Sequence, residues 1–275
     1  LDIPRDLLDK KTLSDRILSP SEYRTVNPKN SGDIQSVTQA ARILLAAESP
    51  LLLAGGGVVD GGASLEAVRL AELLDMAMVP SYGHNDAIPN SHPHYVGSPG
   101  GRGSGEAHEV MDKADVILAL GTRINQGSSS WDYSVINEDT KIIQIDIDPI
   151  EIGRNYPVAV GIVGDAQRVA QQIIEAVCEI SSTGKTNNSW KSEFQSIARK
   201  RIQRLQSEIT LSSDPMMPQQ VFPELTKALP KGSMVTIDAG VAPGLSYDRI
   251  SFEEPRTMFN YAGQGALGMG FSVGL

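Results

Sequence analysis

Glycine and charged residues able to bind a nucleotide recur just after strand-like segments of the chain. They are Gly56, Gly57, Arg123, Asp146 and Asp165. In an open parallel sheet, ligands bind beyond the carboxyl ends of the strands, where glycine permits close backbone approach. Arginine would then face phosphate, and aspartate would face ribose or adenine. A glycine after a strand is also common in an ordinary turn, but the recurrence predicts one nucleotide-shaped cleft or its remnant.

A glycine-rich segment, residues 97–105, precedes a predicted helix and contains Arg102. Such a loop can wrap a phosphate-bearing cofactor, with the arginine as its counter-charge. We therefore place Arg102 in the same predicted cleft.

Three of the four histidines lie in residues 81–94. One interpretation is a metal site, because His-x-His side chains can chelate. The other is a long loop whose polar side chains hydrogen-bond their own backbone. No cysteine accompanies the histidines and the aspartate lacks a characteristic spacing, so the loop is favoured. The single cysteine, Cys178, is expected to be a small buried side chain on the apolar face of a helix. No catalytic nucleophile is assigned.

Helical and strand-like segments alternate from residue 36 to residue 180. Strands are expected over residues 50–54, 78–80, 115–120 and 141–147, and helices over 36–47 (capped by Ser36), 63–74, 106–113 and 166–180. Nearly continuous apolar runs at 116–120 and 142–145 are typical of strands covered by helices on both faces. The pattern predicts a doubly wound, Rossmann-like parallel α/β sheet, with the strands near Leu51, Val116 and Ile143 adjacent.

A polar, turn-rich linker is expected over residues 181–189, before helices over 190–209 and 219–229 and a strand over 233–238. A second α/β unit therefore starts near residue 215. The predicted organisation is a tail and linker (1–34), a middle α/β domain (35–181), a linker and helix (182–214) and the truncated start of a second α/β domain (215–275). The chain lacks an initiator Met and stops within an apolar glycine-rich run, so we expect a piece of a longer protein.

The composition narrows the class of partner. The 275 residues include 24 Lys+Arg and 33 Asp+Glu, for a formal charge of −9. The scattered cations form no basic stripe for nucleic acid, and no apolar run reaches the roughly 20 residues that a membrane span needs. One cysteine excludes an internal disulfide and fits the cytoplasm. The expected partner is a small molecule, with no nucleic acid and no membrane.

Five motifs occur in a set order along the chain: residues 1–6, 52–57, 118–123, 143–149 with 152–153, and 163–166. This series resembles the middle domain of thiamine-diphosphate enzymes of the acetolactate synthase family. Residues 83–93, 121–125 and 160–166 look most similar to its sulfoacetaldehyde acetyltransferase branch.

The resemblance implies three α/β domains, thiamine diphosphate and Mg²⁺ as cofactors, and a homodimer or homotetramer for the full-length protein. Its catalytic Glu is expected upstream of this chain, so no catalytic residue is assigned here. The Gly-Asp-Gly…Asn motif that holds Mg²⁺ is expected downstream. FAD occurs in some members, but the loop after Arg123 departs from the FAD-type pattern.

The resemblance also implies residues that bind thiamine diphosphate. The strand-end turn at Gly240, Val241 and Ala242 would contact the diphosphate. There the family usually has polar side chains, so the contact would rest on the backbone. The carbonyl of Gly265 and the N–H of Leu267 would bind the pyrimidine edge, and the Leu267 side chain would be the wedge that bends the cofactor.

The activity implied by the resemblance is thiamine-diphosphate-dependent acyl transfer or carboligation on a 2-oxo acid or sulfoacetaldehyde. This chain alone is expected to be inactive. Two alternatives stay open: a non-catalytic nucleotide- or FAD-binding module, and a decarboxylase of the same family. A NAD-dependent enzyme is disfavoured because no Gly-x-Gly-x-x-Gly follows the first predicted strand.

Overall fold

The computed structural model describes most of the chain. It covers residues 29–100, 103–130, 132–210, 214–260 and 267–274, together with Asp6, Lys10, Lys11, Ser19 and Glu22. Two predicted site residues, Arg102 and Gly265, lie outside the described residues, as does most of the predicted tail over residues 1–34.

Five parallel strands form the main sheet, in the order β2-β1-β3-β4-β5. Their bounds are β1 (Pro50–Ala54), β2 (Ala77–Pro80), β3 (Val116–Leu120), β4 (Lys141–Asp146) and β5 (Val160–Val163). Leu51 pairs with Ile117, and Leu118 pairs with Ile143, so β1, β3 and β4 are adjacent. The predicted doubly wound parallel sheet is therefore confirmed. The sequence pattern missed β5, a four-residue edge strand that buries only alternate residues.

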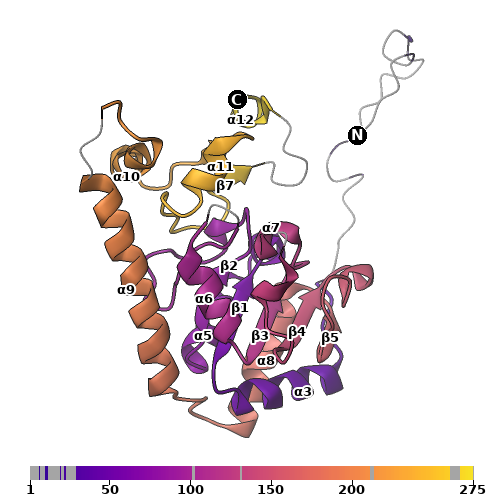
Figure 1. Cartoon of the computed structure of the whole chain (residues 1–275). Coiled ribbons are helices and arrows are strands. Elements are labelled where there is room, and N and C mark those ends of the chain that lie inside the picture. The colour runs from indigo at the N-terminus through magenta and orange to yellow at the C-terminus, as the bar shows by residue number, and fades with distance from the viewer. Residues whose placement is uncertain are drawn as a thin grey trace.

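Helices cover both faces of this sheet (Figure 1). One face carries α3 (Ile34–Ala46), α4 (Gly56–Gly61), α5 (Ser64–Leu73) and α8 (Ala166–Ile180), and the other carries α6 (Gly105–Lys113) and α9 (Asn188–Thr210). Successive strand residues point to opposite faces, so Leu52 packs in the first core and Leu51 and Leu53 in the second. This double burial explains the continuous apolar runs.

Two local predictions on these helices are wrong. The cap of α3 is Asp33, whose carboxylate accepts the backbone N–H of Ser36 at 2.9 Å, so Ser36 lies within the first turn. Cys178 is exposed. The buried stripe of α8 passes through Ile174 and Val177. Cys178 lies about 100° further around the helix than Val177, in the last turn.

The predicted linker is bound to the central domain. The backbone N–H of Asn187 donates to Asp75 at 2.9 Å, and the Lys191 ammonium lies 2.7 Å from the same carboxylate. On α9, Trp190 and Phe194 are buried in the same core as α6. The helix expected in a linker thus contributes to the central core, while the predicted domain boundaries stay predictions.

The C-terminal segment, residues 214–260 and 267–274, folds around a third, smaller core. Its elements are α10 (Pro218–Ala228), β6 (Val235–Ile237), α11 (Val241–Ser246), β7 (Met258–Asn260) and α12 (Met269–Gly274). The two strands are parallel. Ile237, Tyr247 and Phe252 are the centre of its core. This segment lies beyond the loops that follow the strands of the main sheet, at the top of Figure 1.

Short helical turns complete the described chain: η1 (Asn85–Ala87), α7 (Gln126–Ser129), η2 (Tyr133–Val135) and η3 (Pro149–Glu151). Across the residues that the structure describes, we find no helix with both the length and the apolar content that crossing a membrane requires.

Candidate functional site

A cleft of about 500 Å³ lies at the carboxyl edge of the main sheet. Residues that follow all five strands line it, as expected for an open parallel sheet. Five of the residues predicted for this cleft are among them: Gly56, Gly57, Arg123, Asp146 and Asp165. Their role toward a nucleotide stays a prediction.

Three glycines at this edge have a packing role of their own. The turn after β1 lies against the turn after β3, and the Gly57 N–H donates to the Gly121 carbonyl at 2.9 Å. A Cβ on Gly55 would lie 2.3 Å from the Gly121 carbonyl oxygen, and one on Gly57 would lie 2.7 Å from the Gly121 Cα. Close backbone packing therefore accounts for Gly55, Gly57 and Gly121 without any ligand.

The described lining of the cleft carries more carboxylates than guanidinium groups. Asp60, Asp146 and Asp165 bring three carboxylates to the described lining, against the single guanidinium of Arg123. Arg123 also lies 3.6 Å from Glu151, and Asp165 uses one carboxylate oxygen to cap α8. Carboxylates bind ribose hydroxyls but repel phosphate. The Lys29 ammonium lies 3.8 Å from Asp165. The described lining thus offers carboxylates to a ribose and the Arg123 guanidinium to a phosphate.

The histidine-rich loop, residues 81–94, binds the C-terminal segment. Asp86 accepts the backbone N–H groups of Thr257 (3.1 Å) and Met258 (3.2 Å). The Asn85 amide donates to the Tyr247 carbonyl. Asn90 and Phe252 exchange two hydrogen bonds, at 2.9 and 3.0 Å. The polar side chains of this loop thus bond the C-terminal segment in addition to the loop's own backbone, as the sequence predicted for the latter.

Within the loop itself, the Asn90 amide donates to the carbonyls of Asn85 and Ile88. In the described part of the chain, no group of three or more His, Cys, Asp or Glu side chains could hold a metal ion. Three residues at the start of the same loop line the cleft: Ser81, Tyr82 and His84. The loop thus connects the cleft to the C-terminal segment.

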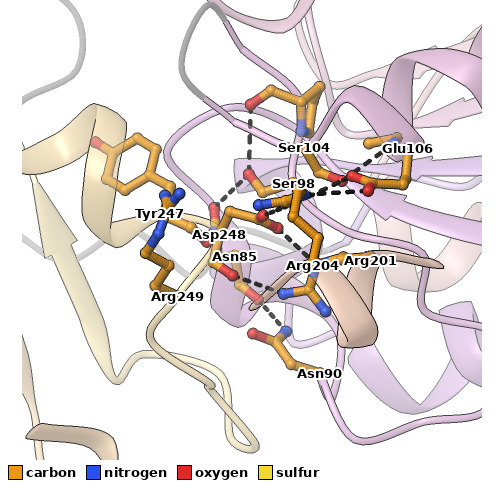
Figure 2. A network of polar contacts seen from close by, with 12 residues as sticks. Asn85, Asn90, Ser98, Ser104, Glu106, Arg201, Arg204, Tyr247, Asp248 and Arg249 are labelled. Atoms are coloured by element: carbon orange, nitrogen blue, oxygen red, sulfur yellow. Dashed lines mark hydrogen bonds and ion pairs between the residues drawn. The ribbon is translucent and has the colours of Figure 1, made fainter. Parts of the chain in front are cut away.

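A charged cluster joins α6, α9 and the C-terminal segment (Figure 2). We call it the ionic cluster; its members are Glu106, Arg201, Arg204, Glu208, Asp248 and Arg249. Three guanidinium groups therefore face three carboxylates. None of these six residues was predicted from the sequence. The only signal was the spacing of Arg201 and Arg204, which places both on one side of a helix.

The cluster gives a pH prediction through Glu106, which takes two 3.1 Å hydrogen bonds from Arg204. Burial by itself raises the pKa of Glu106, but hydrogen bonds from Arg204 and Ser104 outweigh it and lower that pKa from 4.5 to about 2. A lowered folded-state pKa means that the stabilisation is complete above pH 4.5 and is lost as the pH falls toward 2.

We expect the urea midpoint of the wild type to fall more steeply than that of Glu106→Gln between neutral pH and about pH 3. Equal slopes for the two proteins would show that this carboxylate does not contribute to acid sensitivity.

The residues that resemble a thiamine-diphosphate site lie at the end of β6. Asp238 accepts the N–H of Gly268 at 3.0 Å, so the turn after β6 and the turn before α12 are joined. Gly240 has a φ of 109°, and a Cβ there would meet nothing within 4 Å. Leu267, next to Gly268, is 80% exposed.

These residues fit thiamine diphosphate through backbone and apolar contacts. Val241 and Ala242 begin α11 and are exposed, so the open turn at Gly240 would present main chain to a diphosphate bound there. The exposed Leu267 offers an apolar surface to a ring. Residues 241–243 supply no polar side chain, and the described residues supply no group of three or more His, Cys, Asp or Glu side chains for Mg²⁺.

Comparisons with known proteins match this chain to a family model and to enzymes of similar sequence. Residues 37–173 match the family model described as "Thiamine pyrophosphate enzyme, central domain". A sulfoacetaldehyde acetyltransferase of Roseovarius nubinhibens is 36% identical over 242 residues, which are 82% of this chain and 40% of that protein. The acetolactate synthase large subunit of Haemophilus influenzae is 30% identical over 283 residues, which are 100% of this chain and 48% of that protein.

Among solved structures, benzoylformate decarboxylase from Polynucleobacter necessarius is similar with a TM-score of 0.69 and 18% identity, over 91% of this chain and 44% of that one. At this identity the likeness concerns the fold alone. The chain spans less than half the length of each of these three proteins.

Proposed function

Residues 37–173 belong to the central-domain family of the thiamine pyrophosphate enzymes, and from this we propose that the chain supplies the central domain and the start of the cofactor-binding domain of a thiamine-diphosphate-dependent transferase. The observation that carries the proposal is the extent of the similarity. It extends beyond the residues of the family model, over 100% of the chain in the synthase and 82% of the chain in the acetyltransferase.

The proposed reaction, ahead of carboligation of a 2-oxo acid, converts the two-carbon unit of sulfoacetaldehyde to an acetyl group. The C–S bond breaks, the sulfonate leaves as sulfite, and the acetyl group passes to an acyl acceptor. The higher identity to the sulfoacetaldehyde acetyltransferase, 36% against 30% for the acetolactate synthase, supports this order. When bound, thiamine diphosphate supplies the electron sink for such a reaction. The protein's part is to bind and orient it.

Each site residue has a proposed part in that orientation. The backbone at Gly240, Val241 and Ala242 holds the diphosphate, and the Leu267 side chain supports the cofactor rings. Asp238 keeps these two turns together by accepting the Gly268 N–H. Proton transfer at the cofactor is left to a Glu in another domain. A cytoplasmic homodimer or homotetramer completes the proposal.

The test uses the full-length protein that contains this chain, purified and then freed of cofactor by dialysis with a chelator. We expect acetyl transfer from sulfoacetaldehyde to fall to background on removal of thiamine diphosphate and Mg²⁺, and to return when both are added. Carboligation of pyruvate without any reaction of sulfoacetaldehyde would favour the synthase reaction. Release of CO₂ from a 2-oxo acid in the absence of an acyl acceptor would favour a decarboxylase. Acetyl transfer that persists after thiamine diphosphate and Mg²⁺ have been removed would contradict the proposal.

The cleft in the central domain favours a second function, binding of a nucleotide by Gly56, Arg123, Asp146 and Asp165. Its place at the ends of all five strands supports this role. The loop after Arg123 departs from the FAD-type pattern, so we expect the full-length protein to be colourless. A yellow protein with a flavin absorbance band would contradict this expectation.

A further inference from the structure

Asp248 is the most tightly held side chain of the ionic cluster. It is fully buried. One carboxylate oxygen lies 2.6 Å from Arg201 Nε and the other lies 2.6 Å from Arg204 Nη2, while its backbone carbonyl accepts Arg201 Nη2 at 2.7 Å. All three donors come from α9. A buried carboxylate with this many charged donors has one position in which it is satisfied, so α9 fixes Asp248 in space.

The neighbouring residue, Arg249, forms a second ion pair with α9. In this pair the C-terminal segment supplies the cation and α9 supplies the carboxylate, Glu208. The Arg249 guanidinium lies 2.8 and 3.0 Å from the two oxygens of Glu208, and it also donates to the Leu245 carbonyl at 3.0 Å. Leu245 belongs to α11. The side of α9 that carries these charges therefore binds the chain after α11, and Arg249 in turn bonds the last part of α11.

The turn at Gly240 is separated from this anchor only by α11. The helix runs from Val241 to Ser246, and the backbone N–H of Tyr247 continues its hydrogen bonding to the Pro243 carbonyl. A hydrogen-bonded helix transmits the position of one end to the other. The opposite end of α9 is secured in the central core by Trp190 and Phe194. Contacts thus run without a gap from the central core through α9 and Asp248 to the turn at Gly240.

We propose that Asp248, held by Arg201 and Arg204, is a positioning residue for cofactor binding: it sets where the turn Asp238–Ala242 lies relative to the central domain. This inference rests on the function proposed above. Asp248 touches neither cofactor nor substrate in this role. It acts through α11, by fixing the end of the helix that is remote from the turn.

The test compares Asp248→Asn with Asp75→Asn in the full-length protein. Asp75 is a matched control because it is also a buried aspartate that pairs with α9, through Lys191, but at the end of α9 far from α11. We expect the dissociation constant for thiamine diphosphate, measured by titration in Mg²⁺, to rise about tenfold in Asp248→Asn. In Asp75→Asn the thermal midpoint falls and this dissociation constant stays at the wild-type value.

A second readout needs no cofactor. Amide hydrogen exchange over residues 238–246 is expected to be faster in Asp248→Asn and unchanged in Asp75→Asn. Arg204→Lys, which keeps the charge but loses the forked donor, is the milder variant to use if Asp248→Asn does not fold; we expect it to raise the dissociation constant about threefold.

The outcomes separate the inference from the proposed function. A wild type that binds thiamine diphosphate, with Asp248→Asn or Arg204→Lys binding equally well and exchanging no faster over residues 238–246, overturns the positioning role alone. Equal weakening by Asp75→Asn also overturns it, because general destabilisation would then explain the result. A wild type that binds no thiamine diphosphate overturns the proposed function, and the inference with it.

Discussion

Replacing Gly121 with alanine is expected to lower the free energy of unfolding by about 3 to 5 kcal/mol. The new Cβ would lie 2.6 Å from the Cα of Gly57 and 3.0 Å from the backbone nitrogen of Val58. These are main-chain atoms at the centre of the sheet edge, and they cannot move aside as a flexible side chain could. The φ of Gly121 is +59°, which adds strain for any residue with a Cβ. Equilibrium unfolding in urea measures the loss.

Gly105→Ala is the matched control for this substitution. Gly105 is the first residue of α6, and a Cβ there would meet nothing within 4 Å. We expect a change within about 1 kcal/mol, in the stabilising direction, because alanine reduces the freedom of the unfolded chain. If Gly121→Ala were as stable as this control, the two turns after β1 and β3 would not be packed as closely as the structure has them.

Replacing Leu267 with alanine is expected to reduce turnover of the full-length protein roughly 10- to 100-fold, because a small misplacement of a reacting group has effects of that size. This expectation follows from the proposed wedge role. The side chain is 80% exposed in this chain, so its loss is expected to change the free energy of unfolding by no more than about 0.5 kcal/mol. Turnover per folded molecule and urea unfolding are the two measurements.

Leu65→Ala provides the control, since Leu65 on α5 is 83% exposed and lies in the central domain, outside the cofactor-binding residues. It removes the same atoms from a similarly exposed position. A Leu267→Ala variant that unfolds early yet keeps its turnover would mean that the turn before α12 is scaffold and that Leu267 is not a wedge.

Much of the fold could be predicted because burial on both faces leaves a pattern along the chain. The apolar runs at 116–120 and 142–145 read directly as β3 and β4, and the glycines after β1 read as a strand end. Strand β5 could not be predicted in this way. It has only four residues, one of them Gly161, and it buries only every second residue. The prediction for Cys178 was wrong because helical spacing locates a stripe but not where the covering surface stops.

The candidate site divides in a similar way. Gly56, Arg123 and Asp146 could be assigned to one cleft because parallel strands bring their carboxyl ends to one edge. The reason for the neighbouring glycines could not be read from the sequence. In the sequence, a glycine in an ordinary turn cannot be told from a glycine that allows two turns to pack closely. The structure distinguishes them, because a Cβ on Gly121 would lie 2.6 Å from the Cα of Gly57.

The parallel α/β class, the order of its main elements and the family resemblance can be read from the sequence, because they depend on local periodicity and on short motifs. Which charges meet depends instead on how distant segments pack. Arg201 and Asp248 are 47 positions apart, and Arg204 and Glu106 are 98 positions apart. Each of these side chains alone resembles a solvated surface charge. They become a partly buried cluster because α9 packs on the second face of the sheet and brings its arginines between α6 and the C-terminal segment.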